Sequence, residues 1–276
     1  MKKSDLISAL KNNGINRGSK LLLHSSYKSI DFEGAPEEVC KGFMEAIGEE
    51  GLLVMPTHSL NFKNYPKNIG PYNQGRSPSL VGAISDAFWK IPRVARSLHP
   101  THSAAAWGRG ARELVSGHEK VDAIGTDSPI ERFSRTDGKI LMMGCKLNSC
   151  TMGHAAEWQA KVPYLSEHFD PIWGFTAEYI DENDGKVKVY TFKTVPGCSF
   201  GFENAVPWLK EAGFLKEISL NKEISYLIDA AGFLKVVTEK LIQNPGALLI
   251  QDEDHISKCY HCKQVRKLMQ GAVPSS

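Results

Sequence analysis

Short apolar runs alternate with amphipathic stretches along the first half of the chain. Residues 20–24 read Lys-Leu-Leu-Leu-His and residues 51–55 read Gly-Leu-Leu-Val-Met, which predicts two buried strands. Between them, apolar residues over 36–47 recur at helical spacing, and Pro36 stands in the first turn of the predicted helix. A strand, a helix and a strand in succession favour an α/β fold.

The same periodicities predict more elements up to residue 160. Residues 60–76 show little periodicity, so we expect a long loop there, and such loops in compact domains are often functional. The sequence leaves open whether residues 61–76 act as a lid. The other predictions are a third buried strand over 139–143 and helices over 4–13, with Ser4 as N-cap, 80–89, 129–134 and 151–160.

Beyond Pro163 the pattern becomes richer in β-forming residues. Residues 175–180 and 186–192 predict two strands, and the Asp-Gly pair that ends the segment 181–185 between them is typical of a β-hairpin. No linker separates two folding units, so we predict a single domain over residues 1–276. Later elements are helices over 204–212 and 231–241 and weaker strands over 218–220, 225–228 and 248–251.

Composition and charge narrow the class of protein. The 276 residues, 42% of them hydrophobic and 23% charged, suffice for a substantial core. The 33 basic residues nearly balance the 31 acidic ones and are scattered, which argues against nucleic-acid binding. Apolar stretches are too short for a membrane span, and the start has no secretory signal. We therefore predict a cytoplasmic protein that binds neither nucleic acid nor membrane; homo-oligomerisation stays open.

His154 and Glu157 are the candidate pair for acid–base chemistry. They lie three residues apart on a predicted helix and so share a face. The carboxylate can accept the Nδ1–H of the imidazole and leave Nε2 free to take a proton. The helix follows a buried strand, a common position for catalytic groups in α/β sheets. On spacing alone an ordinary pair on an exposed helix face is the commoner explanation, and two ligands are too few for a metal site.

Two polar stretches are candidate anion sites. Residues 96–103 read Arg-Ser-Leu-His-Pro-Thr-His-Ser, and arginine and hydroxyl donors suit phosphate, while the histidines could act as bases or ligands. These groups could equally satisfy the backbone of their own loop. Residues 24–27, His-Ser-Ser-Tyr, directly follow a predicted strand, where hydroxyl and N–H groups can bind an anion or an oxyanion. An ordinary strand-to-loop turn is the commoner explanation there, and the Gly-x-Ser-x-Gly pattern is missing.

The cysteines raise the question of a metal. Cys259 and Cys262 form a Cys-x-x-Cys pair, and His255 precedes them by four residues. Such a group can begin a zinc site, but a second Cys-x-x-Cys is absent, and Cys198 could join only if the fold brings it close. We therefore favour free thiols over zinc, and over disulfides in a cytosolic chain. The six cysteines are Cys40, Cys145, Cys150, Cys198, Cys259 and Cys262.

Several motifs occur in the order of a known family. The chain resembles the aminoglycoside 3-N-acetyltransferase family from about Leu21 to Ala160, and more weakly to about Leu249. The strongest motifs are Arg-Ser-x-His-Pro-x-x-Ser and Thr-x-x-His-x-x-Glu. The matching segments are Leu-His-Ser-Ser at 23–26, Met-Pro-Thr at 55–57, Ser-Pro-Ser at 77–79, Gly-Ala at 82–83, residues 96–103, Gly-Thr-Asp-Ser-Pro at 125–129 and residues 151–157.

This resemblance implies a fold and a reaction. The fold would be a three-layer α/β/α sandwich with a mixed central sheet and a β-hairpin excursion in the second half. The reaction would move an acetyl group from acetyl-CoA, as co-substrate, to an amine of an aminoglycoside-like acceptor, with no metal required. By position, His154 would be the general base and Glu157 its orienting partner. The coenzyme path would contain Ser25, Ser26, Ser79, Arg96, Ser97 and Ser103, and the reacting centre would be shaped by Thr57, His99 and Ser128.

Some features depart from the drug-modifying members and leave the acceptor open. Gly153 stands where a larger residue is expected. Aminoglycosides are polycations, so their pocket should be acidic; the candidate carboxylates are those of 181–184, 252–254, Glu167, Asp170 and Glu203. A pocket without carboxylates would favour an acyltransferase of the same fold that acts on another amine. A thioesterase stays open as well, and so does a coenzyme A-binding or zinc-bearing protein without turnover.

Overall fold

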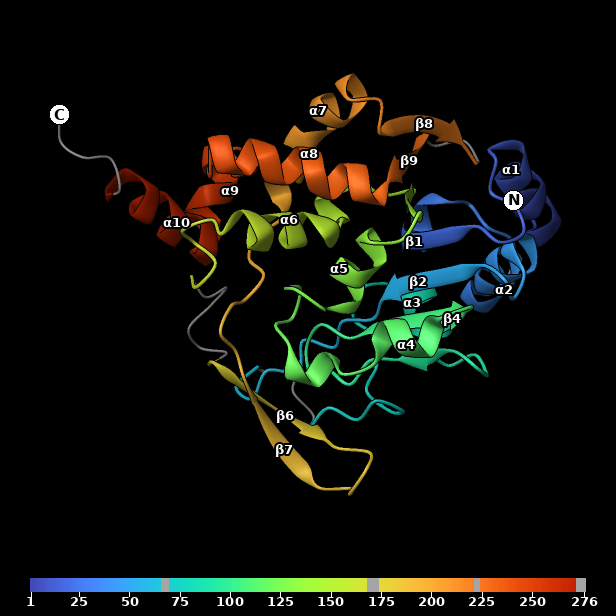
Figure 1. The fold of residues 1–276 in the computed structure, drawn as a ribbon, viewed down its shortest axis with the longest axis horizontal. Coiled ribbons are helices and arrows are strands. Elements are labelled where there is room, and N and C mark those ends of the chain that lie inside the picture. Colours follow the sequence, from blue (N-terminus) through green and yellow to red (C-terminus); the bar gives the residue numbers. More distant parts are fainter. Residues whose placement is uncertain (66–69, 168–173, 221–223, 272–276) are drawn as a thin grey trace.

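A seven-stranded mixed sheet forms the centre of the molecule (Figure 1). The computed structural model describes residues 1–65, 70–167, 174–220 and 224–271. The strand order is β3-β4-β2-β1-β5-β9-β8; β1 runs parallel to β2 and β5, and the other neighbours are antiparallel. The strands are β1 (Lys20–Ser25), β2 (Leu52–Pro56), β3 (Ala95–Arg96), β4 (Ala104–Gly108), β5 (Lys139–Met143), β8 (Leu215–Ser219) and β9 (Ile224–Asp229).

Helices cover both faces of this sheet, because successive side chains of a strand point to opposite faces. Leu21 and Leu23 of β1 belong to the core under one helical layer, whereas Leu22 belongs to the core under the other. The predicted three-layer α/β/α sandwich is therefore confirmed. One layer contains α1 (Lys3–Asn12), α2 (Pro36–Ile47) and α3 (Ala83–Phe88), and the other α4 (Ala111–Val115), α5 (Pro129–Ser134), α6 (Met152–Ala160), α7 (Ala205–Glu211) and α8 (Ala230–Gln243).

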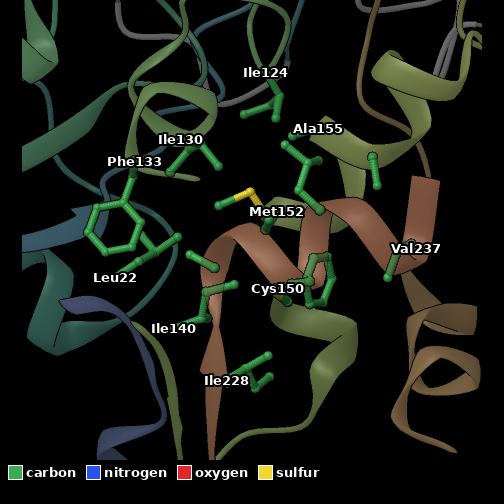
Figure 2. Close-up of a cluster of buried hydrophobic side chains, with 14 of the residues drawn as sticks. Leu22, Ile124, Ile130, Phe133, Ile140, Cys150, Met152, Ala155, Ile228 and Val237 are labelled. Atoms are coloured by element: carbon green, nitrogen blue, oxygen red, sulfur yellow. The ribbon is translucent and has the colours of Figure 1, made fainter. Parts of the chain in front are cut away.

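The larger core fixes α6 on the sheet. Figure 2 shows Leu22, Ile140 and Ile228, from three neighbouring strands, in the same cluster as Met152 and Ala155 of α6. All five side chains are buried, and burying a large aliphatic side chain contributes about 1.5–3 kcal/mol. Because α8 packs beside α6 (Figure 1), the α6 helix is held from two directions.

The second half contains the predicted hairpin. Strands β6 (Thr176–Ile180) and β7 (Val187–Thr191) pair in an antiparallel two-stranded sheet that extends away from the central one (Figure 1). Two residues of the predicted loop pair with it, through bridges from Phe62 to Ala177 and from Tyr72 to Tyr179. The predicted long loop is thus anchored on the hairpin on both sides of residues 66–69, which lie outside the described ranges.

Two further helices, α9 (Glu253–Lys258) and α10 (Tyr260–Gly271), end the described chain, and short 3-10 turns connect other elements. Sequence analysis missed these helices and also β3, β4 and α4. Strand β4 reads Ala-Ala-Ala-Trp-Gly, which lacks the β-branched residues typical of strands. The 3-10 turns are η1 (Tyr27–Ser29), η2 (His118–Lys120), η3 (Leu147–Ser149) and η5 (Phe200–Asn204).

Some predicted boundaries were wrong. The N-cap of α1 is Lys2, whose N–H donates to the Asp5 carboxylate at 2.9 Å, so Ser4 lies inside the first turn. Helix α3 starts only at residue 83, because Leu80 N–H donates to the carbonyl of His58 and leaves the helical path. Residues 248–251 are irregular rather than a strand. The other two weakly predicted strands, 218–220 and 225–228, correspond to the longer strands β8 and β9. The single-domain assignment stays a prediction.

None of the helices in the described ranges combines the length and the apolar character needed to cross a bilayer.

Candidate active site

A cavity of about 520 Å³ opens beyond the ends of β1 and β2 and beside the start of α6. This volume lies in the range of small-molecule sites, about 300–1,000 Å³. The carboxyl ends of parallel strands are the usual position for ligands in α/β sheets. The lining residues are Leu23, His24, Ser25, Pro56, His58, Leu60, Phe62, Leu80, Val81, Ser85, His102, Asn148, Ser149, Cys150, Thr151, His154, Val195, Pro196, Gly197 and Ser199.

His154 and Glu157 meet on α6 as the spacing predicts. Nδ1 of His154 lies 2.7 Å from Oε2 of Glu157, with side-chain exposures of 12% and 6%. A carboxylate in this position accepts the Nδ1–H, and the other ring nitrogen, Nε2, is then the one that can exchange a proton. His154 lines the cavity, whereas Glu157 is buried behind it and outside the lining.

Tyr164 holds the second oxygen of Glu157, and sequence analysis missed it. Its hydroxyl lies 3.3 Å from Oε1 of Glu157 and 3.0 Å from the carbonyl oxygen of Pro245. Lys161 ends α6 in the left-handed conformation, φ 53°, which turns the chain back and brings Tyr164 against the helix. Burial and the Glu157 charge raise the pKa of Tyr164, so the phenol stays protonated and able to donate.

Gly153 allows an aromatic ring to reach His154. A Cβ at Gly153 would lie 2.1 Å from a ring carbon of Phe202, a distance that no packing tolerates. The Phe202 ring in turn lies 4.8 Å from the His154 ring, centroid to centroid. The glycine that departs from the expected pattern therefore has a packing reason, which is the close approach of η5 to α6.

A group of buried histidines forms another wall. Desolvation lowers the pKa of His24 and of His58 to about 3, and the pKa of His102 also lies well below its usual value, so all three are neutral at pH 7. Within the described structure, Nε2 of His24 and Nε2 of His58 are buried without a hydrogen-bond partner. His58 was missed by sequence analysis, although it directly follows the Met-Pro-Thr segment at the end of β2.

Arg96 is surrounded by protein. Its Nη2 donates to the carbonyl of Thr57 at 2.8 Å, and its Nη1 donates to that of Ser77 at 2.6 Å. Its guanidinium lies between the rings of Trp89 and Tyr72, 4.5 and 5.2 Å from their centroids. Only 5% of Arg96 is exposed. Its hydrogen bonds to Thr57 and Ser77 connect β3, which contains Arg96, to the segment that follows β2. Its place on the coenzyme path stays a prediction.

Most of the other predicted residues also lie beside the cavity rather than on it. Thr57 and Ser103 are fully buried partners, 3.1 Å apart through their hydroxyls. Ser97 binds Nδ1 of His118 at 2.9 Å, and Nδ1 of His99 accepts the N–H of His102 at 3.0 Å. Ser25 lines the cavity, Ser26 bonds Ser29, and Ser79 is buried next to α3.

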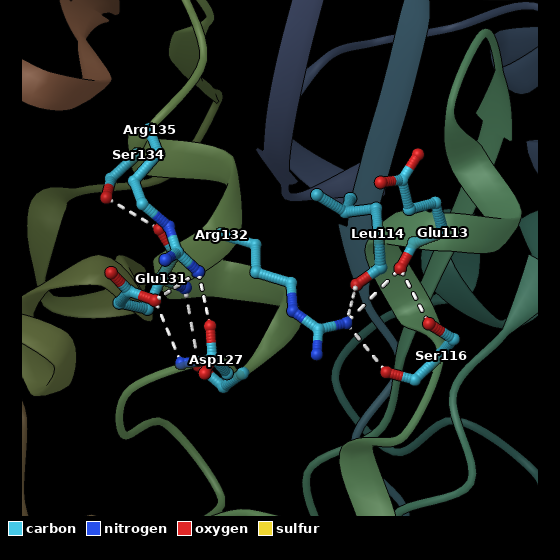
Figure 3. A network of polar contacts seen from close by, with 9 residues as sticks. Glu113, Leu114, Ser116, Asp127, Glu131, Arg132, Ser134 and Arg135 are labelled. Carbon is cyan, nitrogen blue, oxygen red and sulfur yellow. Dashed lines mark hydrogen bonds and ion pairs between the residues drawn. The ribbon is translucent and has the colours of Figure 1, made fainter.

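Ser128 belongs to a separate structural network. It caps α5 through its hydroxyl. Figure 3 shows how the same helix is tied to its surroundings: Arg132 donates to backbone carbonyls that include Ser116 at 2.6 Å, and Arg135 pairs with Asp127 at 2.7 Å. Ser128 thus stabilises the helix, and a role in shaping the reacting centre stays a prediction.

Comparisons with known proteins identify the family of the chain. A sequence model described as aminoglycoside 3-N-acetyltransferase matches residues 22–242. The chain belongs to this family. The prediction of an aminoglycoside N(3)-acetyltransferase-like enzyme is thereby confirmed.

Individual relatives cover most of the chain. Aminoglycoside N(3)-acetyltransferase IV of Salmonella sp is 31% identical over 247 residues, which are 88% of each protein. Aminoglycoside N(3)-acetyltransferase III of Salmonella sp is 31% identical over 226 residues, 72% of this chain and 78% of the relative. A crystal structure of a histidine-to-alanine mutant of aminoglycoside acetyltransferase AAC(3)-IVa, in complex with a gentamicin, covers 96% of both chains at 29% identity with a TM-score of 0.81.

The candidate carboxylates of a polycation pocket lie elsewhere. In the part of the chain that the structure describes, the cavity lining includes no aspartate or glutamate. Asp181 pairs with Lys188 at the hairpin, Asp252 caps α9, and Glu203 accepts the N–H of Leu147. Glu167 is half-buried outside the lining, and Asp170 lies outside the described residues.

Proposed function

We propose that this protein transfers the acetyl group of acetyl-CoA to an amine of an aminoglycoside-like acceptor, with His154 as general base. The observation that carries the proposal is the 2.7 Å contact between Nδ1 of His154 and Oε2 of Glu157, on a helix that starts at the cavity. Membership of an acetyltransferase family supports the class of reaction. Acetyl-CoA is a co-substrate here, and the expectation that the reaction needs no metal stays a prediction.

Proton transfer is the first requirement. An alkyl ammonium group cannot attack a thioester until it loses a proton, and Nε2 of His154 is the acceptor that we propose for it. The nitrogen lone pair then attacks the carbonyl carbon, and a tetrahedral intermediate forms. When the C–S bond breaks, the imidazolium returns its proton to the leaving thiolate, and the nitrogen releases its second excess proton to solvent, which leaves a neutral amide. Glu157 stabilises the transient imidazolium, and no covalent acyl-enzyme is needed.

The oxyanion of the intermediate needs hydrogen-bond donors. The backbone N–H of Ser26, in the stretch 24–27 that the sequence suggests for an oxyanion, donates to the carbonyl of Met143 at 3.0 Å, and that of Thr57 donates to the carbonyl of Ser103 at 2.8 Å, which argues against both as oxyanion donors. We propose His58 instead. Its neutral imidazole lines the cavity, and within the described part of the chain its buried Nε2 has no hydrogen-bond partner.

The coenzyme would approach along the end of β1. Ser25 lines the cavity there and is the residue of the predicted path that a ligand can reach directly. Ser26 is the next residue in the chain. Ser79, Ser97 and Ser103 are buried outside the cavity lining and would act indirectly, through the residues that line the cavity. Thr57 and His99 would shape the centre in the same indirect way. A cytoplasmic location stays a prediction from the sequence.

The composition of the cavity supports a second candidate function. A pocket for a polycation should supply negative charge, and the described lining has none. An acyltransferase of the same fold that acts on a less charged amine fits this uncharged lining better. Both functions share the base, the coenzyme and the tetrahedral intermediate, and they differ only in the acceptor.

Thiol release from acetyl-CoA tests the proposal. The enzyme is assayed alone, with a panel of 2-deoxystreptamine aminoglycosides and with small mono- and diamines, and products are analysed by mass spectrometry. Release that depends on an aminoglycoside, with one acetyl group added to the drug, supports the main proposal. Release that depends only on a simpler amine supports the second candidate. Release without any amine identifies a thioesterase and overturns both.

A further inference from the structure

Four side chains with metal-binding atoms meet where the C-terminal helices contact the rest of the protein. They are Cys198, His255, Cys259 and Cys262, and their ligand atoms all lie within 4.8 Å of one another. Sγ of Cys198 lies 3.2 Å from Nε2 of His255. We propose that these residues form a structural zinc site that fastens the two C-terminal helices to the wall of the active-site cavity.

The chemistry of the four groups fits zinc. Cys₃His is one of the common donor sets of structural zinc sites, which are four-coordinate and tetrahedral. With Zn–S of about 2.3 Å and Zn–N of about 2.0–2.1 Å, a tetrahedron separates its donor atoms by roughly 3.5–3.8 Å. The observed separations need only small side-chain rotations to reach this geometry. Thiolate and imidazole donors also select zinc over calcium or magnesium, which prefer oxygen.

The fold brings Cys198, the fourth proposed ligand, next to the other three, which the sequence alone could not show. Cys259 follows the last turn of α9, and Cys262 lies in the first turn of α10, so the Cys-x-x-Cys pair spans the bend between two helices. His255 adds a third ligand from α9. Cys198 comes from the segment after β7, 57 residues before His255 in the chain. The condition for a complete site, that Cys198 lies close to the pair, is met.

Neighbouring groups orient the proposed ligands, as groups outside the coordination sphere commonly do at metal sites. The Phe200 ring lies on the His255 ring, with centroids 4.2 Å apart and an interplanar angle of 32°. The N–H of Cys198 donates to Nδ1 of His261 at 3.2 Å. His261 itself packs closely over Gly197, where a Cβ would lie 2.1 Å from Nε2 of that ring.

The position of the cluster explains what such a metal would do. Gly197 and Ser199, on either side of Cys198, line the active-site cavity, whereas none of the four proposed ligands does. All four coordination positions would be filled by protein, which is typical of structural rather than catalytic zinc. The metal would therefore hold the cavity wall and η5, which carries Phe202, in place without taking part in acetyl transfer.

Metal analysis of the full-length, untagged protein tests the site. The protein is expressed in zinc-supplemented medium and purified under reducing conditions, and zinc is measured by mass spectrometry. We expect about one zinc per chain, as in a closed structural site. Cys198→Ser, Cys259→Ser and His255→Ala should each lose most of the zinc. Cys145→Ser is the matched control, because Cys145 is a half-buried cysteine outside the cluster, and it should keep the metal.

Two further measurements keep the test decisive if a variant folds poorly. Metal-free wild-type protein titrated with Co²⁺ alone should develop thiolate-to-cobalt charge-transfer absorption and the visible bands of tetrahedral cobalt. A chelator should lower the Tm of the wild type and of Cys145→Ser, but not that of Cys198→Ser. The proposal is overturned if the wild type contains no zinc and shows no cobalt spectrum. It is equally overturned if two of the six thiols titrate as a disulfide, or if all the ligand variants keep zinc.

Discussion

The phenol oxygen of Tyr164 lies 3.3 Å from Oε1 of Glu157, while the other carboxylate oxygen faces His154. The carboxylate is therefore bound at both ends and can hold the imidazole in one orientation and one tautomer. Tyr164 does not line the cavity, so we propose that it is a positioning residue that acts through Glu157.

Replacing Tyr164 by Phe should slow the reaction without affecting coenzyme binding. The loss of one hydrogen bond to a carboxylate corresponds to about 1.5–3 kcal/mol, which sets an upper limit of about a 13- to 160-fold fall in kcat. Steady-state thiol release measures kcat and the KM for acetyl-CoA separately. A variant that loses stability but keeps the wild-type kcat and pH profile would show that Tyr164 only supports the fold.

His154→Ala should reduce the chemical step by roughly 10²–10⁴-fold, because it removes the proposed base. Affinity for the coenzyme, measured by calorimetry, should stay close to that of the wild type. Glu157→Gln is the companion variant. It keeps a hydrogen-bond acceptor for Nδ1 but removes the charge, so its kcat should lie between that of the wild type and that of His154→Ala. Turnover of His154→Ala at the wild-type rate would disprove the assignment of the base.

Arg96→Ala should destabilise the protein strongly. It leaves the buried carbonyls of Thr57 and Ser77 without their charged donor, and each hydrogen bond from a charged group contributes about 1.5–3 kcal/mol. Urea unfolding measures the change. Arg17→Ala is the control, since Arg17 forms an exposed pair with Glu50 and should have a much smaller effect.

Coenzyme affinity of the same variant separates the two roles of Arg96. The structural role predicts a large fall in the free energy of unfolding, with weakened coenzyme binding only as a consequence of local disorder. A normal unfolding curve together with a raised Kd for coenzyme A would instead place the guanidinium on the phosphate path, as the motif suggests.

Gly153→Ala should impair both stability and catalysis. The new methyl group overlaps the Phe202 ring, and overpacking of this kind costs typically about 1–3 kcal/mol. The ring must move, so its contact with His154 changes and kcat should fall. Adding Phe202→Leu should restore part of the lost stability, and a double-mutant cycle measures the coupling. Purely additive effects would contradict the proposed contact.

Acidification should unfold the protein through its buried histidines. Burial holds the pKa of His24, His58 and His118 at about 3 in the folded state, against 6.5 in the unfolded chain. The unfolded state thus binds more protons between these values. Stability from this source is fully present above pH 6.5 and decreases as the pH falls toward 3, by up to about 1.4 kcal/mol per pH unit for each histidine.

Urea unfolding at several pH values between 7.5 and 4.5 measures this slope. His118→Asn removes one titrating group and should make the stability less dependent on pH over that interval, whatever its effect at pH 7.5. His118 suits this test because it lies behind the cavity wall, where Ser97 and the Ala123 carbonyl bind its ring. An identical slope in the wild type and the variant would contradict the assignment.

Local patterns were enough to predict the elements that carry the chemistry. The buried strands 20–24 and 139–143 are apolar runs, and the pair His154–Glu157 depends only on helical spacing, so both follow from interactions between residues close in the chain. The hairpin followed in the same way from its Asp-Gly turn.

Contacts between distant segments were decided only by the tertiary structure. Phe202 over Gly153 and Cys198 beside His255 join segments whose separation along the chain gives no signal of contact. Only the tertiary structure shows that the Arg96 guanidinium donates to the buried carbonyls of Thr57 and Ser77, whereas its place on the coenzyme path stays a prediction. A side chain's environment depends on the packing of whole layers, because desolvation and unsatisfied polar groups are properties of the assembled core rather than of a local sequence pattern.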